Sequence, residues 1–174
     1  MALISIAEII DIIIMVLATG YIFLPERTWP AYKTMMMVTG PAIVCHELAH
    51  KFVAILVGLQ ATIHASMFGL GLGIALRAIG SPFVFFVPGF ASIAGSMAPW
   101  QNLVISVAGP ATNGILYLVS SHMLKKSVGQ SHISKHYMLL TLTKKVNGFL
   151  FVLNMIPIPG FDGSHVLSAL LRML

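Results

Sequence analysis

Four stretches of the chain are long runs of apolar residues separated by short polar segments. The first, residues 4–24, holds 21 residues, which in a helix measure roughly 31 Å and can cross the hydrocarbon core of a bilayer. Residues 34–59 and 100–123 form the second and third runs. The fourth, residues 146–174, is interrupted after 11 residues by the Pro-Ile-Pro segment at 157–159. The pattern predicts an all-α membrane protein with about four transmembrane helices.

The interruption in the fourth run extends over residues 157–163 and includes Gly160 and Gly163. The piece before it is too short to span a bilayer alone, so we expect one membrane helix broken in the middle. Unwound backbone at membrane depth is tolerated only where it is buried in protein or lines a watery cavity. The break therefore predicts a polar site inside the membrane.

Residues 60–98 have a different pattern. Small and large residues alternate with period two over residues 69–74, which is typical of a strand. Residues 82–86 and 90–93 are candidates for further short strands, with Pro88-Gly89 as a turn. We expect a small sheet or reentrant hairpins that dip into the membrane between the second and third helices. Residues 127–136 form a clearly polar loop.

Composition agrees with a membrane protein. The chain of 174 residues is 57% hydrophobic and 9% charged, and its mean hydropathy is +0.93. Soluble domains carry about a quarter charged residues. The net charge of +5 fits membrane–water boundaries, and no basic patch interleaved with aromatic residues indicates nucleic-acid binding. We expect one membrane-embedded domain, residues 1–174, integral to the membrane.

The first apolar run does not resemble a cleaved signal peptide. It lacks a basic N-terminal region and carries Glu8 and Asp11 instead, so we interpret it as a retained helix. The single cysteine, Cys45, excludes a disulfide within the chain. Although it precedes His46, neighbours on a helix point about 100° apart. We therefore interpret Cys45 as a small buried apolar residue and not as a metal ligand.

The segment His46-Glu47-Leu48-Ala49-His50 carries candidate chemistry. His46 and His50 are four residues apart and share one helix face, where two imidazoles can bind one Zn²⁺. Glu47 lies close enough to accept a proton from the metal-bound water. The alternative is a polar contact between helices without a metal. An ionisable residue within an apolar helix costs about 2.5–3.5 kcal/mol on insertion scales, which favours the functional interpretation.

Catalytic zinc commonly has three protein ligands and one open position. Few acidic residues can supply the third ligand here. Glu8 and Asp11 could face the interior of a helix bundle, whereas Asp162 lies in the broken stretch already predicted to be polar. Asp162 is the best candidate, although an Asp before a Gly is also a common turn residue.

Three segments together resemble the site-2 protease family of intramembrane zinc metalloproteases. His46–His50 and residues 154–163, Asn-x-x-Pro-x-Pro-x-x-Asp-Gly, are similar to its two main motifs. Residues 108–113, Ala-Gly-Pro-Ala-Thr-Asn, resemble its Ala-Gly-Pro-x-x-Asn segment, and residues 85–93 resemble a stretch of compact archaeal members. The chain departs from the family at Lys51, where many members have a small or apolar residue.

The resemblance implies one Zn²⁺ held by His46, His50 and Asp162, with Glu47 as general base. It also implies that Asn154 lies beside the site, where its amide could bind substrate or the developing oxyanion; backbone capping at the break is the alternative. Asn113 is a weaker candidate for substrate binding, because it could instead satisfy backbone groups freed at Gly109-Pro110. The expected location is a prokaryotic cell membrane.

The other histidines have simpler interpretations. His64 lies in the expected sheet, and His122, His132 and His136 lie in or beside the polar loop; we expect all four at the surface. His165 is three residues from Asp162 and could support the site, but a structural role is favoured.

The sequence thus predicts proteolysis of transmembrane protein substrates within the lipid bilayer. A helical substrate must unwind locally, and residues 69–74 could offer a strand edge that pairs with it; packing against the second helix is the alternative. A zinc or proton transport protein and a catalytically inactive membrane scaffold remain alternatives for the whole chain. Transporters often contain repeats, which this chain lacks, and an intact Glu47 disfavours a scaffold.

Basic residues predict a membrane orientation that conflicts with the family's. We place Arg27 and Lys33 on the same side as the lysines between the third and fourth helices, which are Lys125, Lys126, Lys135, Lys144 and Lys145. The positive-inside rule puts that side in the cytoplasm. The resemblance implies the opposite, because the family opens its active site towards the cytoplasm.

Overall fold

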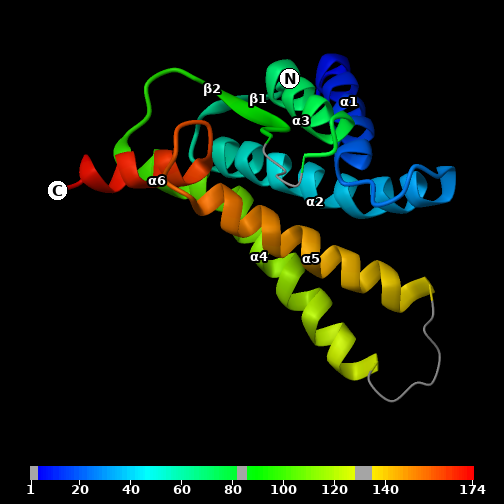
Figure 1. Cartoon of the computed structure of the whole chain (residues 1–174). Coiled ribbons are helices and arrows are strands. Elements are labelled where there is room, and N and C mark those ends of the chain that lie inside the picture. Colours follow the sequence, from blue (N-terminus) through cyan, green and yellow to red (C-terminus); the bar gives the residue numbers. More distant parts are fainter. Residues whose placement is uncertain (1–3, 82–85, 128–134) are drawn as a thin grey trace.

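The computed structural model describes residues 4–81, 86–127 and 135–174 (Figure 1). In these residues the chain is mostly helical, with one antiparallel sheet of two strands. The elements in chain order are α1 (Ile6–Ile22), α2 (Trp29–Leu56), β1 (Gln60–Ala65), α3 (Met67–Ala78), β2 (Gly89–Ala94), α4 (Pro99–Ser127), α5 (Lys135–Met155) and α6 (Asp162–Leu171).

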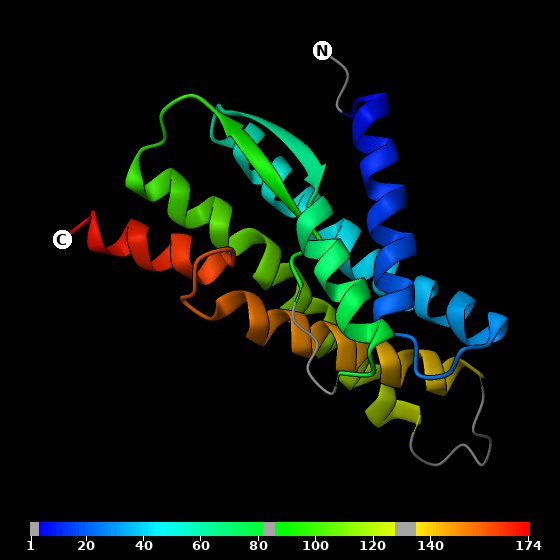
Figure 2. The ribbon, with the colours of Figure 1, turned by 45° about the horizontal axis from the view of Figure 1, so that its top comes forward.

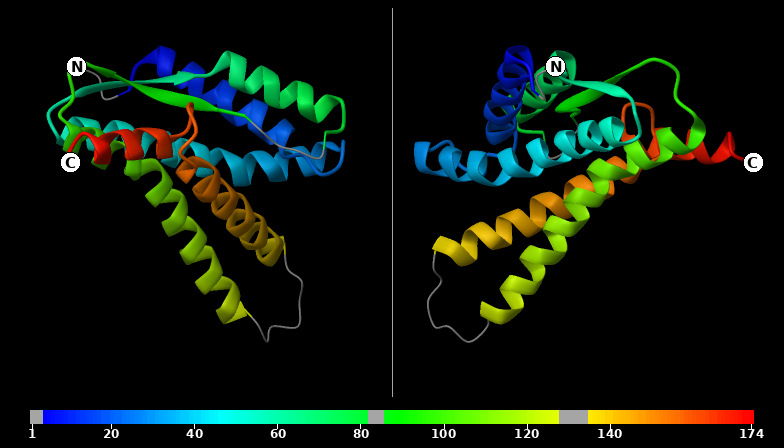
Figure 3. Two further views of the ribbon diagram at one scale, coloured as in Figure 1. Left: turned by 60° about the vertical axis from the view of Figure 1, so that its left-hand side comes forward. Right: turned by 180° about the vertical axis from the view of Figure 1, so that it is seen from behind.

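Helix α2 lies in the middle of the molecule. The sheet, α1 and α3 lie on one side of it, and α4, α5 and α6 lie on the other (Figures 1 and 3). The two strands run over the C-terminal half of α2 (Figure 2). The main apolar core joins α1, α2, β1 and α5 and includes Met15, Ile22, Val38, Ile43, Ile63 and Leu150. The candidate chemistry of α2 is therefore enclosed from both sides.

The predicted helices exist, but several boundaries differ. Helix α2 begins at Trp29 rather than at residue 34, because Thr28 caps its N-terminus and Pro30 occupies its first turn, where a missing N–H costs nothing. Helix α5 begins at Lys135 rather than at residue 146. Charged residues at both ends of its first eleven residues, Lys135 and the pair Lys144-Lys145, interrupt the apolar pattern there. Part of the predicted polar loop, residues 128–134, lies outside the described residues.

Three of the lysines from which the orientation was predicted, Lys135, Lys144 and Lys145, lie within α5 and not in a loop. Lys144 and Lys145 are helical, and the Lys144 Nζ atom lies over the ring of Tyr117 of α4, 5.5 Å from its centroid. Their assignment to the connecting loop is therefore wrong, and the positive charge between α4 and α5 is smaller than the sequence suggested.

The predicted strand at residues 69–74 is wrong, because these residues belong to α3. Gly69 and Gly73 are four apart and lie on one buried helix face, whereas Gly71 faces open space. A Cβ at Gly69 would overlap the Val87 carbonyl, and one at Gly73 would lie 2.9 Å from Phe86 Cβ. The glycines permit close helix packing, and their period of two is compatible with either structure.

The predicted strand at residues 90–93 is confirmed within β2. It pairs antiparallel with β1, with Ile63 opposite Ala91 and Ala65 opposite Gly89. Pro88-Gly89 is therefore not a turn, since Gly89 begins the strand and the Pro88 carbonyl accepts a bond from the Ser66 N–H. Of the predicted strand at 82–86, residues 82–85 lie outside the described part, and Phe86 is buried but not in a strand.

One helix in the described part of the chain is long and apolar enough to cross a membrane, by length and composition, and it spans Pro99–Lys126 of α4. The prediction of four transmembrane helices is not confirmed by this criterion. Helix α1 has 17 residues, and α2 contains the charged residues of the His46–Lys51 segment.

Candidate metal centre

The turn of α2 from His46 to His50 places both imidazoles on the buried side of the helix. Their Nε2 atoms lie 3.1 Å apart, and both rings are almost completely buried. Glu47 is 2% exposed, and its Oε2 atom has no hydrogen-bond partner among the described residues. The spacing of four residues on a helix therefore produces the expected pair of nitrogen donors with a carboxylate beside it.

The break between α5 and α6 brings Asp162 to the same place. Gly160 has a φ of +99°, which only glycine adopts at low cost, and this residue turns the chain back. Gly163 packs against the carbonyls of Met155 and Ile156, where a Cβ would not fit. Helix α6 can therefore begin directly beside the end of α5, with Asp162 as its first residue.

Asp162 Oδ2 lies 3.1 Å from His46 Nε2 and 3.3 Å from His50 Nε2. Two ligands of a tetrahedral Zn²⁺ are separated by about 3.3 Å when each bond is about 2.0 Å long. The three observed separations thus match one face of such a tetrahedron. Asp162 Oδ2 is buried without a hydrogen-bond partner, as expected for an oxygen whose partner is a cation. In the described part of the chain, these three residues are the group that could hold a metal ion.

Each imidazole has its other nitrogen occupied. His46 Nδ1 lies 2.6 Å from Asn113 Oδ1, and His50 Nδ1 lies 2.7 Å from the Ile105 carbonyl oxygen. Both partners are acceptors, so each Nδ1 carries the hydrogen and each Nε2 presents its lone pair towards Asp162. Both rings are therefore held in the tautomer that can bind a metal.

Asn113 lies in the interior of the protein. It is fully buried and is not part of the cleft beside the histidines. Its amide bonds His46 and, through Nδ2, the carbonyl of Ala42 in α2. Its placement favours orientation of a ligand over contact with substrate. Asn113 does bond a backbone carbonyl, but that carbonyl belongs to Ala42 of α2 and is not one of the groups freed at Gly109-Pro110.

Gly109 of α4 has a function that the sequence did not reveal. A Cβ at this position would overlap the rings of both His46 and His50. A residue without a side chain therefore lets α4 approach α2 closely enough for Ile105 and Asn113 to reach the imidazoles. From the sequence, the Gly109-Pro110 pair indicates only backbone groups freed from helical hydrogen bonding.

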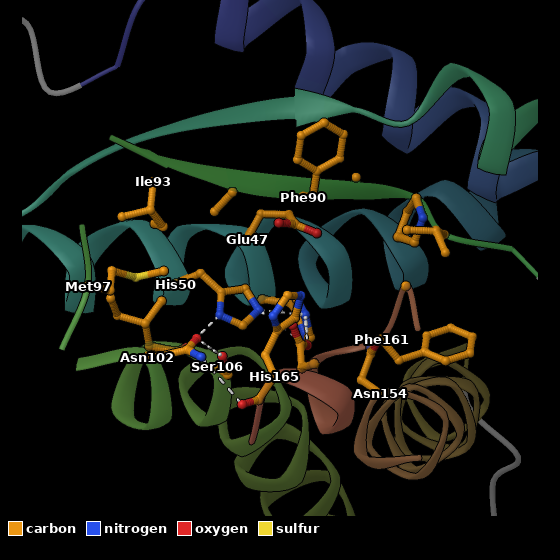
Figure 4. A pocket seen from close by; sticks show the side chains of 18 residues that line it. Glu47, His50, Phe90, Ile93, Met97, Asn102, Ser106, Asn154, Phe161 and His165 are labelled. Atoms are coloured by element: carbon orange, nitrogen blue, oxygen red, sulfur yellow. Dashed lines mark hydrogen bonds and ion pairs between the residues drawn. The ribbon is translucent and has the colours of Figure 1, made fainter. Parts of the chain in front are cut away.

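A cleft of about 150 Å³ opens beside the histidines. Phe90 and Ile93 of β2 form one wall, and Asn102 and Ser106 of α4 form the other, with Glu47 on the side facing β2 (Figure 4). Asn154 also lines the cleft, and its role in binding substrate stays a prediction. The cleft is bordered by extended backbone on one side and polar side chains on the other.

The other acidic candidates lie elsewhere. Glu8 forms a buried ion pair with Lys51 and accepts a 3.0 Å bond from the Ile63 N–H, so it joins α1, α2 and β1. Asp11 lies 3.7 Å from His64. The ion pair with Glu8 explains why the chain can carry Lys51 where many members of the family have a small or apolar residue. Neither Lys51 nor Glu8 reaches the metal centre.

The remaining single residues are placed as follows. His64, His122 and His136 are exposed, and His132 lies outside the described residues. His165 lines the cleft, and its backbone carbonyl accepts a bond from Asn102. Cys45 is exposed, so the expectation of a buried side chain is wrong. It lies on the side of α2 opposite the interior, which an apolar sequence context could not indicate.

Comparison with known proteins extends the similarity beyond these motifs. The chain is 34% identical over 165 residues to "Putative zinc metalloprotease MJ0611" of Methanocaldococcus jannaschii, and the match covers 92% of this chain and 83% of that protein. No protein-family model matches the chain. No solved structure matches it. The identity extends over most of both sequences and is not confined to the His46–His50 turn.

Proposed function

Since this chain belongs to the zinc metalloprotease family of the Methanocaldococcus jannaschii protein and has zinc as its cofactor, we propose that it cleaves peptide bonds in or near transmembrane segments. His46, His50 and Asp162 hold the ion, and Glu47 is the general base. The observation that carries the proposal is the convergence of Asp162 on the two imidazoles, beside a buried carboxylate with a free oxygen.

The surface of the helices supports a position within the membrane. Large apolar side chains are exposed along several helices, on a scale that a water-facing surface rarely shows. Examples are Ile6, Ile9, Ile10, Ile13 and Leu17 on α1, Ile115, Leu118 and Val119 on α4, and Phe151 and Val152 on α5. We propose that α1, α2, α4 and the broken pair α5–α6 all cross the bilayer, in a single multi-pass domain.

Zinc, when bound, supplies a Lewis acid that polarises the scissile carbonyl and makes a water molecule more acidic. Glu47 takes a proton from that water as the water oxygen bonds to the carbonyl carbon. It then delivers the proton to the amide nitrogen as the C–N bond breaks, which releases an amine and a carboxylate. The Asn154 amide, on the cleft wall, can donate to the oxyanion that develops on the carbonyl oxygen.

Strand β2 offers the substrate an edge. In the described residues β2 pairs with β1 on one side only, and its Phe90 and Ile93 side chains reach the cleft. An unwound segment of a transmembrane substrate can extend beside this strand and present its carbonyl to the metal centre. This function belongs to β2 and not to residues 69–74, which form α3.

The test is Glu47→Gln, which keeps the size of the side chain and removes the base. We expect cleavage of a helical transmembrane peptide in lipid vesicles to fall by at least about a hundredfold, because general-base catalysis contributes about 10²–10⁴. Zinc content, measured by metal analysis, stays at the wild-type level.

Asp11→Asn is the matched control, because it changes a carboxylate outside the metal centre, and we expect it to cleave normally. Full activity in Glu47→Gln would refute the mechanism. Zinc binding without any cleavage by the wild type would favour a transport protein or an inactive scaffold instead.

A further inference from the structure

Two fully buried asparagines lie behind the metal centre and connect three helices. Asn113 of α4 donates through Nδ2 to Asn147 Oδ1 of α5, at 2.9 Å, and contacts His46 of α2 on its other side. Both asparagines have no exposed surface. Asn147 does not line the cleft and contacts no candidate ligand directly. A polar side chain buried at this depth is costly unless its bonds serve a purpose.

The hydrogen bonds determine which way each amide points. Asn147 Nδ2 donates to the Thr143 carbonyl at 2.8 Å, which directs its Oδ1 towards Asn113. Asn113 Nδ2 donates both to this oxygen and to the Ala42 carbonyl, at 3.0 Å. The Asn113 Oδ1 atom must therefore face His46 Nδ1. The Thr143 carbonyl of α5 therefore orients the Asn147 amide, and the Asn147 amide in turn orients that of Asn113.

The two imidazoles differ in how they are held. His50 Nδ1 donates to a backbone carbonyl, that of Ile105, which cannot reverse its polarity. His46 Nδ1 donates to a side-chain amide, which can rotate by 180° and present NH₂ instead. A rotated Asn113 would require His46 Nδ1 to be the acceptor, and the hydrogen would move to Nε2, where it blocks metal binding.

We propose that Asn147 is a positioning residue for the zinc site: it holds the Asn113 amide so that His46 keeps its metal-binding tautomer. The inference rests on the proposed function only in taking His46 as a zinc ligand. If Asn147 instead only joined α4 to α5, its loss would lower the free energy of unfolding and leave zinc affinity unchanged.

The test measures zinc affinity of the detergent-solubilised full chain by competition with a chelator. Asn147→Leu removes the acceptor at similar size, and we expect a loss of about 10–100-fold, as for other partners of metal-ligating histidines. Asn147→Asp keeps an acceptor for Asn113 and, when protonated, a donor for Thr143, so we expect near wild-type affinity. Ser120→Ala is the control. This buried hydroxyl of α4 bonds the Leu116 carbonyl of its own helix, and Ser120 does not belong to the Asn147–Asn113–His46 network.

A double-mutant cycle separates the proposed path from general destabilisation. Because Asn147 acts through Asn113, the pair Asn113→Leu plus Asn147→Leu loses no more affinity than Asn113→Leu alone. Additive losses would overturn the proposal, as would an unchanged affinity in Asn147→Leu. If Asn147→Leu fails to fold, the Asn147→Asp variant decides. A loss of zinc affinity in Asn147→Asp as large as that in Asn113→Leu would also overturn the proposal.

His46→Ala separates a failure of the proposed ligand set from a failure of the proposed role of Asn147. Unchanged zinc binding in His46→Ala would refute the proposed ligand set itself. A strong loss in His46→Ala with none in Asn147→Leu would refute only the role of Asn147.

Discussion

The His46–His50 turn of α2 and the junction between α5 and α6 bring candidate ligands to one point by different means. The turn does so within one continuous helix, where a spacing of four residues is sufficient. The junction requires a chain reversal at Gly160 and a close backbone contact at Gly163 before Asp162 can face the imidazoles. The helix should therefore tolerate changes between its ligands, whereas the junction should not.

The largest expected effect comes from removing one ligand of each region. We expect His50→Ala and Asp162→Ala each to lower zinc affinity by more than about 100-fold, beyond the loss usual for a supporting residue, and to abolish cleavage. Chelator competition and the vesicle assay measure the two effects. Asp11→Ala serves as the control carboxylate. Wild-type zinc binding in Asp162→Ala would show that the junction between α5 and α6 supplies no zinc ligand.

Packing around the ligands provides a sharper contrast. Gly163→Ala places a methyl group 2.6 Å from the Ile156 carbonyl oxygen, so we expect a loss of about 1–3 kcal/mol in stability and a clear drop in zinc affinity. Ala49→Gly, inside the α2 turn, costs up to about 1 kcal/mol of helix stability and leaves zinc affinity unchanged. Thermal unfolding and chelator competition test both variants. Equal effects on affinity would contradict the comparison.

The smallest expected effect concerns the two glycines with positive φ that follow α2 and α5. Gly58 has φ +83° and Gly160 has φ +99°, and neither has a close neighbour around its missing side chain. Alanine at either position should cost about 1–2 kcal/mol of stability. Only Gly160→Ala should also weaken zinc binding, because Gly160, unlike Gly58, lies in the segment that leads to Asp162. A similar loss of affinity in Gly58→Ala would show that the effect is general destabilisation.

The same contrast explains which sequence predictions were accurate. The histidine pair and the strand at residues 90–93 depend on neighbours in the chain, and both were found. The strand predicted at residues 69–74 failed because Gly69 and Gly73 suit a helix face as well as a strand face. Only their contacts with Val87 and Phe86 distinguish the two structures.

Other features depend on partners that are remote in sequence. Asn147 is an ordinary polar residue of α5 until its bond to Asn113 is known. The reason for Lys51 is visible only in the fold, where it forms an ion pair with Glu8, a residue 43 positions away in the sequence. Cys45 faces outwards because of how α2 packs, which its apolar neighbours did not indicate.

The sequence by itself determined the chemistry of this protein: two imidazoles and a carboxylate on one helical turn, and a helix break that carries an aspartate. Spacing along a regular helix and the backbone limits of proline and glycine are local properties, which residue order specifies directly. Only the tertiary structure decided that Asp162 meets His46 and His50, that Gly109 leaves room for α4, and that Asn113 and Asn147 orient one imidazole. These features are distances between separate helices, and they exist only once the helices have packed.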